Sequence, residues 1–270
     1  MRCFCLFSIL VFLSSCSSKI TKPSYIRFEV TTDSIKVNAT NTKTSPFHVV
    51  AFKNAKVVSD TVVVLSNETK LLLSFSSETL DTTTILKDIT FRASYGNPKM
   101  TSYDTLYNYQ LPFPKNKTYQ ILQGNQTNFT HKGIFSTYAL DFKMPVGDTV
   151  CAARSGYVAG VVKKFSKNGK DKSYRDYANY ITLYHDDGTF SQYVHLKENG
   201  ALVNVNDYVE KGQAIGLSGN TGWSTEPHLH FAVFKSLPMQ FESIPILLNG
   251  KDSRTHKKWE RVFHQKDSIK

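Results

Sequence analysis

Short runs of β-branched and aromatic residues recur along most of the chain, and clusters of Asn, Asp, Ser, Thr and Gly separate them. A chain punctuated in this way is expected to form strands joined by turns. The upstream runs are Tyr25–Val30, Ser34–Val37, His48–Phe52, Thr61–Leu65, Leu71–Phe75 and Ile85–Arg92. The downstream runs are Tyr157–Val162, Tyr180–Tyr184, Phe190–His195, Ala214–Leu217 and His228–Phe234. The sequence therefore predicts a mainly β protein.

A chain of 270 residues is long enough for two domains. The natural boundary is Leu111–Pro114, because two prolines this close together cannot continue a central strand. We expect residues 25–110 to form a β-sandwich-like module and residues 111–250 a β-rich second domain with a barrel-sandwich-like core. Residues 251–270 are interpreted as a basic C-terminal tail. Asp186-Asp187-Gly188 predicts a hairpin turn, and we expect the neighbouring His185 at the surface.

The N-terminus predicts an exported protein. Arg2 precedes an apolar run, Phe4–Leu13, that is too short to span a bilayer but suits a signal peptide. The residues that follow, up to Cys16, resemble the lipobox of bacterial lipoproteins, in which cleavage leaves the cysteine as a lipidated N-terminus. Residues 1–16 are therefore the predicted lipoprotein signal. An ordinary signal peptide cut near Ser15 is the alternative, and it also predicts export.

Lipidation of Cys16 would anchor the mature chain to a membrane through a short polar tether, residues 17–24. Ser17 after the cysteine suggests, by analogy with diderm lipoproteins, an outer-membrane location facing the periplasm. The two earlier cysteines leave with the signal, so Cys151 is the remaining internal thiol and has no internal disulfide partner. Its apolar neighbours predict a buried small side chain rather than a nucleophile.

Basic charge is concentrated in two stretches of a chain whose formal net charge is +11. Residues 163–176 hold six basic and two acidic residues, and residues 251–270 hold seven basic and three acidic ones. The basic charge is therefore expected to lie at the periphery of the fold. It could be solvated charge of loops and tail, or it could attract the chain weakly to an anionic cell wall or to lipid head groups. It does not alternate with aromatic residues along one element, so no nucleic-acid partner is predicted.

Two histidines stand two positions apart in Pro227–Phe231, a segment that predicts a strand. Alternate residues of a strand face the same side, so His228 and His230 would project together while the apolar residues pack behind them. Zinc binds imidazole nitrogens and carboxylate oxygens, and a catalytic zinc uses three protein ligands with a fourth position open. The layout therefore suits metal ligands, although any one histidine alone could be a core or turn residue.

Three motifs together resemble one known family. The first is His131 with Tyr138–Phe142, the second is Tyr193–Leu196, and the third is Gly219–Gly222 with Pro227–Phe231. They are similar to the lysostaphin-type, LytM-like zinc metalloendopeptidases, which cut peptide bridges in bacterial peptidoglycan. The resemblance covers roughly half of the chain, from about Leu111 to about Pro245. In the commonest family spacing the first histidine lies closer to the aspartate than positions 131 and 141 do here. The wider spacing resembles a lipoprotein-like subgroup.

The resemblance implies that His131, Asp141 and His230 bind Zn²⁺ and that His195 and His228 handle the water and the developing oxyanion. It also implies that peptides of peptidoglycan are the substrate. An extended peptide could be held by five further residues, for which ordinary loop and turn chemistry is the alternative: Asn179, Tyr180, Thr221, Trp223 and Ser224. For Glu226 the two readings are a carboxylate that orients a histidine and a residue at the rim of the site.

Two rival functions follow from the same sequence. A LytM-like domain that has lost catalysis could activate another cell-wall hydrolase. A carrier or efflux-adaptor-like β module would explain the similarity between Val146–Val150 and Val205–Val209. The carrier reading leaves the histidines without a role, and bound zinc would separate both rivals from an enzyme.

Overall fold

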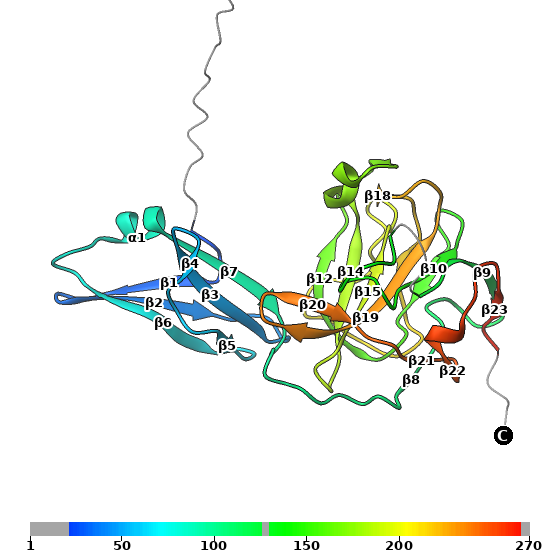
Figure 1. Ribbon diagram of the computed structural model, residues 1–270, viewed down its shortest axis with the longest axis horizontal. Helices are drawn as coiled ribbons and strands as arrows, with labels where there is room; N and C mark the ends of the chain where they lie inside the picture. Colours follow the sequence, from blue (N-terminus) through cyan, green and yellow to red (C-terminus); the bar gives the residue numbers. More distant parts are fainter. Residues whose placement is uncertain (1–21, 126–129, 266–270) are drawn as a thin grey trace, which may run out of the picture.

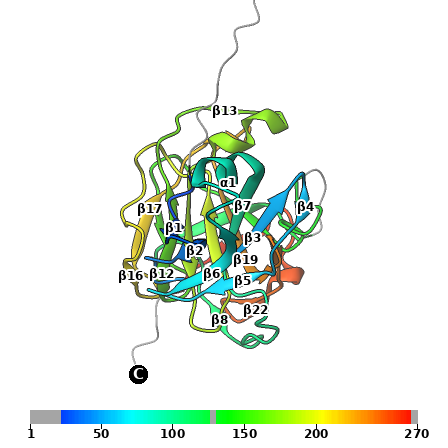
Figure 2. The ribbon, with the colours of Figure 1, turned by 90° about the vertical axis from the view of Figure 1, so that its left-hand side faces the viewer.

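The computed structural model describes residues 22–125 and 130–265, and the protein is mainly β, as predicted (Figure 1). The strands form two bodies that lie side by side, one from the N-terminal part of the chain and one from the rest (Figures 1 and 2). The predicted signal peptide and Cys16 lie outside the described residues, so membrane attachment stays a prediction. Among the described helices, none has the length and apolar character needed to cross a bilayer.

The N-terminal body consists of two small sheets that share one core. Its strands follow the order β1-β2-β6 in one sheet and β4-β3-β5 in the other, where β7 also pairs with β3. Ile26, Val37, Val49 and Phe91 pack into the common core, which gives a sandwich-like arrangement. The elements are β1 (Ile26–Val30), β2 (Ser34–Thr40), β3 (Phe47–Lys53), β4 (Lys56–Val57), β5 (Val62–Val64), β6 (Thr69–Ser76), α1 (Thr82–Asp88) and β7 (Ile89–Tyr95).

The predicted strand Ile85–Arg92 is wrong in its first half, because α1 occupies Thr82–Asp88 and β7 begins only at Ile89. Asp81 caps this helix, and its side chain accepts a hydrogen bond from the backbone N–H of Thr84 at 2.8 Å. The β-branched residues favour a strand locally, but the N-cap and the burial of Ile85 against the core stabilise one short helical segment instead.

The second body is built around one large sheet with the strand order β16-β12-β14-β15-β19-β10-β9-β23, and β20 pairs with β19. This path is open, and no sheet of the described chain closes into a barrel. The strands are β9 (Thr118–Gln123), β10 (Leu140–Lys143), β12 (Gly156–Val162), β14 (Tyr180–Tyr184), β15 (Phe190–Val194), β16 (Tyr208–Val209), β19 (Leu229–Leu237), β20 (Gln240–Ser243) and β23 (Arg261–Phe263).

Shorter elements form separate small sheets outside the large sheet. The pairs are β11 with β17, β13 with β18, and β21 with both β8 and β22. These elements are β8 (Asn108–Tyr109), β11 (Thr149–Cys151), β13 (Asn168–Gly169), the 3₁₀ helix η1 (Lys172–Tyr177), β17 (Ala214–Leu217), β18 (Gly222–Trp223), β21 (Leu247–Leu248), β22 (Lys251–Asp252) and the 3₁₀ helix η2 (Ser253–Thr255).

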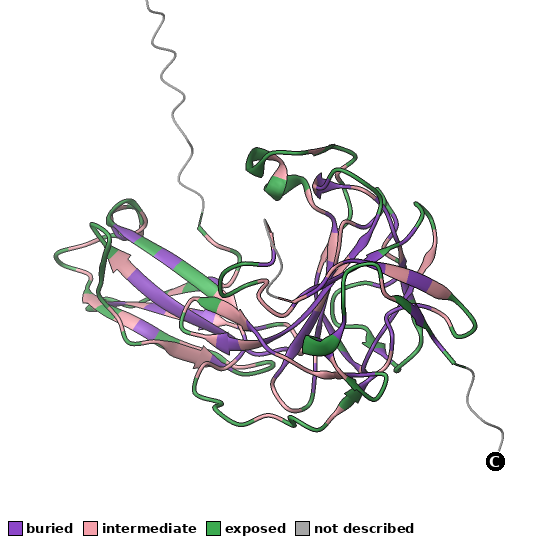
Figure 3. Ribbon diagram, turned by 45° about the vertical axis from the view of Figure 1, so that its right-hand side comes forward, coloured by how far each residue is buried: buried purple, intermediate pink, exposed green. Residues whose placement is uncertain are grey.

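Large buried side chains form the core of the second body. Figure 3 marks the buried residues along its strands in purple. Phe113 is fully buried, and its ring lies edge to face with those of Tyr119 at 4.7 Å and Phe142 at 5.6 Å. Tyr109 and Leu111 belong to the same core. Residues on both sides of the predicted boundary therefore pack into the second body.

The segment that we interpreted as a basic tail is folded as far as the structure describes it. It forms β22, η2 and β23, and β23 pairs with β9 at the edge of the large sheet. Ser253 and His264 are buried, and the His264 ring lies edge to face with Phe113 at 5.9 Å. Strand pairing and aromatic contacts thus hold this segment against the second body.

The predicted hairpin at Asp186-Asp187-Gly188 is confirmed, because it joins β14 to β15 with Tyr184 opposite Phe190. The expectation that His185 lies at the surface is wrong. Its side chain is fully buried, with Nδ1 2.9 Å from the Ser155 carbonyl and Nε2 2.9 Å from Ser191 Oγ. Burial lowers the pKa of His185 to about 4, so the ring is neutral. Polar partners within the fold compensate for the burial, and sequence position alone does not reveal them.

We expect Phe113→Ala to lower the free energy of unfolding by about 3–5 kcal/mol, because it removes a fully buried ring and leaves a cavity. Urea unfolding followed by circular dichroism measures the loss. The matched control is Phe263→Ala, since that side chain is 51% exposed; its cost should be about 1 kcal/mol or less. Equal losses in the two variants would contradict the packing described for Phe113.

Candidate metal centre

An aspartate and a histidine face each other across two neighbouring strands. In the antiparallel pair β10–β19, Asp141 lies directly opposite His230, and Phe142 lies opposite Leu229. Opposed residues share one face of a sheet. The polar pair therefore faces a groove, while Phe142 and Leu229 are fully buried on the core side. His230 Nδ1 and Asp141 Oδ1 are 2.8 Å apart.

His131 reaches the same carboxylate from the loop that precedes β10. Its ring is fully buried, and its Nε2 lies 3.2 Å from Asp141 Oδ2. Its Nδ1 lies 2.8 Å from the carbonyl oxygen of Gly124. A carbonyl oxygen can only accept, so Nδ1 carries a proton and Nε2 is the ring atom that faces Asp141. Burial would lower the pKa of His131, but the charge of Asp141 raises it above its ordinary value.

These three side chains fit a metal ion. One ligand atom from each of His131, Asp141 and His230 lies within 4.8 Å of the other two. Among the described residues, Nε2 of His131 is buried without a hydrogen-bond partner. In the neutral ring this nitrogen and the nearby carboxylate oxygen both present lone pairs, so a proton or a cation is needed between them. Two imidazole nitrogens with one carboxylate oxygen are a donor set that zinc accepts.

Two further histidines lie beside this cluster. His195 follows the last residue of β15, and His228 immediately precedes β19. Their ring centroids are 4.6 Å apart, and the His195 ring is 6.0 Å from that of His230. His228 Nε2 lies 3.9 Å from Asp141 Oδ1. The structure thus gathers in one place the four histidines and the aspartate that the sequence singles out.

Backbone carbonyls orient both of these rings. His195 donates from Nδ1 to the carbonyl of Thr221 at 2.6 Å, and His228 donates from Nδ1 to the carbonyl of Glu226 at 2.8 Å. In each neutral ring, Nε2 is then the atom with the lone pair. His195 also has a φ of 65°, a left-handed conformation that costs a non-glycine residue about 1–2 kcal/mol.

Burial and neighbouring groups set the protonation states in the cluster. Burial lowers the pKa of His195 to about 3, and His228 and His230 act in the same direction. His195 is therefore neutral near pH 7. Burial would raise the pKa of the Asp141 carboxyl, but His228 and His131 hold it well below its ordinary value. Asp141 is thus a carboxylate at neutral pH, which is the form that binds metal.

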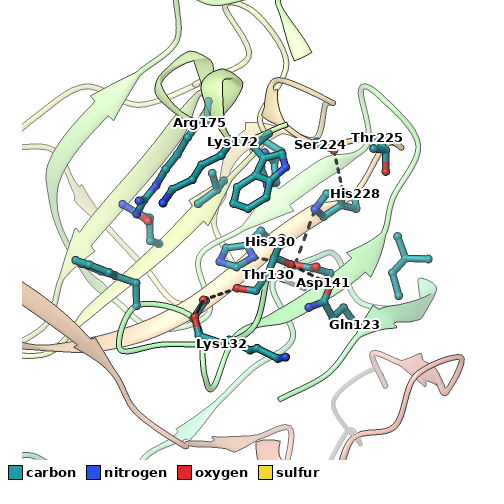
Figure 4. A pocket seen from close by; sticks show the side chains of 18 of the residues that line it. Gln123, Thr130, Lys132, Asp141, Lys172, Arg175, Ser224, Thr225, His228 and His230 are labelled. Carbon is teal, nitrogen blue, oxygen red and sulfur yellow. Dashed lines mark hydrogen bonds and ion pairs between the residues drawn. The ribbon is translucent and has the colours of Figure 1, made fainter. Parts of the chain in front are cut away.

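The cluster lines a groove of about 870 Å³. Figure 4 shows His230 and Asp141 in its middle, with Lys172 and Arg175 on one side and Lys132 on the other. Phenylalanine and tryptophan side chains also line this groove: Phe135, Trp223, Phe234, Phe241 and Trp259. Its volume lies in the range of small-molecule and peptide sites.

The sequence pattern of peptidase family M23 matches residues 135–241. These residues form an M23 peptidase domain. The domain contains Asp141, His195, His228 and His230, whereas His131 lies just upstream of the matched range. The LytM-like resemblance inferred from the three motifs is therefore confirmed.

Part of the chain is similar to known proteins. The chain is 36% identical over 127 residues to an uncharacterized metalloprotease of Buchnera aphidicola, covering 46% of this chain and 31% of that protein. It is 38% identical over 92 residues to the peptidoglycan DD-endopeptidase ShyA of Vibrio cholerae, covering 34% of this chain and 18% of that protein. The structure of the antimicrobial peptidase lysostaphin from Staphylococcus simulans shares 33% identity, with a TM-score of 0.36 and coverage of 46% and 47%. The chain thus spans less than a third of the length of both curated relatives.

The five predicted groove residues divide into two groups in the M23 domain. Trp223 and Ser224 line the groove, and Asn179, Tyr180 and Thr221 are not among its lining residues. Asn179 is fully buried and donates from Nδ2 to the carbonyls of Phe165 and Leu196. Thr221 Oγ1 accepts from the Asn179 N–H and donates to the Leu196 carbonyl. Asn179 and Thr221 therefore hold the loop whose carbonyl orients His195.

Sequence reasoning missed the backbone atoms that orient the histidines. The carboxylate of Glu226 is exposed and lies 3.8 Å from Lys143 Nζ, so the Glu226 carbonyl, and not its side chain, orients His228. Gly124 plays the same part for His131. A carbonyl acceptor has no residue-type signature, so only the fold could reveal these contacts.

We expect Asn179→Ala to lower the free energy of unfolding by about 1–3 kcal/mol, because it leaves the partly buried N–H and carbonyl of Phe165 without their side-chain partner and removes one of the two side-chain hydrogen bonds to the Leu196 carbonyl. Chemical denaturation measures the loss. Asn204 is exposed and serves as the matched control, with an expected change within about 0.5 kcal/mol for Asn204→Ala. Weaker peptide binding by Asn179→Ala at unchanged stability would instead favour the groove role.

Proposed function

We propose that the chain is a zinc-dependent endopeptidase that hydrolyses peptide bonds in the stem or cross-link peptides of peptidoglycan. The observation that carries the proposal is the His131–Asp141–His230 cluster with two further oriented histidines beside it. The M23 domain and the similarity to a metalloprotease and to a peptidoglycan DD-endopeptidase support it.

The ligands would be His131 through Nε2, an oxygen of Asp141, and His230 through Nδ1, the atom that faces Asp141. Bound zinc would polarise the scissile carbonyl and lower the pKa of a water towards neutrality. The Gly124 carbonyl keeps the His131 ring in the tautomer that leaves Nε2 free to bind. Such support from outside the ligand set commonly tunes metal affinity.

His195 and His228 would handle the protons. Each ring is held through Nδ1 by a backbone carbonyl, so each has Nε2 available for the reaction. A neutral Nε2 can take the proton of the attacking water, and a protonated Nε2 can donate a hydrogen bond to the oxyanion that develops on the amide. Because both Nδ1 bonds fix ring orientation in advance, neither ring has to reorganise as the charge develops.

The alternative is a catalytically inactive M23 domain that activates another cell-wall hydrolase. All five positions expected to bind metal or act on the substrate are filled in this chain, which favours the enzyme. Incubation of the purified chain with defined muropeptides, with and without chelator, followed by mass analysis of the products, decides between them. Chelator-sensitive cleavage supports the enzyme, and absence of cleavage by zinc-loaded protein supports the regulator.

One zinc per chain should bind to the wild type, and Asp141→Ala or His230→Ala should weaken its affinity by about 100-fold or more, because three ligands hold the metal and none is spare. Metal analysis after dialysis against a competing chelator measures the occupancy. Glu226→Gln is the control, since this carboxylate lies on the same groove outside the ligand set and its loss should leave zinc in place. Full zinc occupancy in both ligand variants would contradict the assignment of Asp141 and His230 as metal ligands.

His195→Ala and His228→Ala should keep zinc and lower kcat by about 10²–10³, the loss typical of one group that acts only in the transition state. Muropeptide turnover and metal content are measured on the same preparations. Loss of zinc in His228→Ala would show that the roles of His228 and His230 are exchanged. Unchanged turnover in both variants would remove the proposed proton transfers.

A further inference from the structure

Cationic side chains gather around the groove from three separate segments. One lies in the loop before β10, three lie in the stretch that includes η1, and one lies in the loop before β23. We call them the basic rim: Lys132, Lys170, Lys172, Arg175 and Lys258. All five are exposed to solvent.

The basic rim assembles the two basic stretches that the sequence analysis interpreted as peripheral. Residues 163–176 supply three of its members and residues 251–265 supply one. The sequence separates these stretches widely, whereas the fold places both beside the metal ligands. Figure 4 shows Lys172 and Arg175 on the opposite side of His230 from Lys132, so cations flank the cluster from two sides.

Few acidic side chains line the groove beside the basic rim. Among the groove-lining residues the acids are Asp141, which lies between the histidines, and Glu226, which lies 3.8 Å from Lys143. Within the described ranges no rim cation forms an ion pair, whereas Lys251 and Arg254 of the same C-terminal segment are paired with Glu260 and Asp252. Among the groove-lining residues the cations therefore outnumber the acids, and outside that lining the exposed Asp171 interacts electrostatically with Lys170.

Contacts along the groove hold parts of the basic rim in position. The Arg175 guanidinium lies 5.7 Å from the ring centroid of Phe135, which belongs to the loop before β10. Trp223 donates from its indole N–H to the carbonyl of Lys170 at 3.0 Å. Lys258 Nζ lies 4.7 Å from the ring centroid of Trp259. A cleft lined by one sign of charge concentrates ligands of the opposite sign.

We propose that the basic rim makes the groove selective for acidic peptides, whose carboxylates pair with Lys172 and Arg175 on one side of the cleaved bond and with Lys132 on the other. The inference rests on the proposed endopeptidase function and narrows its substrate class. Each contact is an exposed ion pair and is weak alone, so selectivity comes from several acting together. Added salt must reduce it, because exposed charges are screened.

The two tryptophans of the chain, Trp223 and Trp259, both line the groove, so their fluorescence reports binding without turnover. The probes are a cross-linked muropeptide dimer with free carboxylates and the same dimer with those carboxylates converted to primary amides. Metal-free full-length chain, prepared by dialysis, is titrated with each at low and high salt. The zinc-loaded chain is then tested for cleavage of both.

The wild type should bind the acidic dimer about tenfold more tightly than the amide, which corresponds to about 1.4 kcal/mol, and high salt should remove most of this difference. The double variant Lys172→Gln/Arg175→Gln should lose most of the preference. The matched control removes two lysines of the N-terminal body, Lys36→Gln/Lys53→Gln, which pair with Glu29 and Asp88. It should keep the wild-type preference.

Equal affinity for the two dimers, or a full preference in the double variant, overturns the inference. Equally strong competition by a short DNA duplex overturns the assignment to peptides. Cleavage of both dimers with equal kcat/KM supports the proposed endopeptidase function and contradicts the selectivity for acidic peptides. Tight, salt-sensitive binding of the acidic dimer without any cleavage supports the basic rim and contradicts the proposed function.

Discussion

The register of β10 against β19 fixes the candidate metal centre. It places Asp141 opposite His230 on the groove side and Phe142 opposite Leu229 on the core side. A slip by one residue would turn the polar pair into the core and the apolar pair out to the groove. The core contacts of Phe142 and Leu229 therefore stabilise the pairing of a carboxylate with imidazoles. Burying that carboxylate would be costly if the imidazoles did not lie beside it as partners.

Backbone carbonyls of the loops orient the histidine rings of the site. The carbonyls of Gly124, Thr221 and Glu226 each accept from the Nδ1 atom of one histidine. Because a carbonyl cannot donate, each contact selects the tautomer as well as the orientation. Gly124 also lies so close to the C-terminal segment that a Cβ there would be 2.8 Å from the carbonyl oxygen of His256. The segment interpreted as a tail thus packs behind the first ligand.

Periodicity in the sequence predicted the mainly β fold and the shared face of His228 and His230, because both depend on neighbours along one strand. The features that it missed depend on contacts between distant segments. The burial of His185 relies on hydrogen bonds to the Ser155 carbonyl and from the Ser191 hydroxyl. The position of the basic rim relies on the η1 stretch and the C-terminal segment meeting at one groove. The helix at Thr82–Asp88 was missed for a local reason, since its β-branched residues outweighed the cap signal of Asp81.

The strand β19 connects the histidine cluster with the N-terminal body. One end continues from His228, and the other passes through the turn to β20, where the backbone N–H of Met239 donates to His48 Nε2 at 2.9 Å. His48 is fully buried and donates from Nδ1 to the Gly96 carbonyl, while burial lowers its pKa and keeps the ring neutral. A neutral ring is required here, because Nε2 can accept from Met239 only without a proton. The strand that bears a candidate metal ligand is thus held at its far end by the other body, so the N-terminal module supports the same sheet that positions the site.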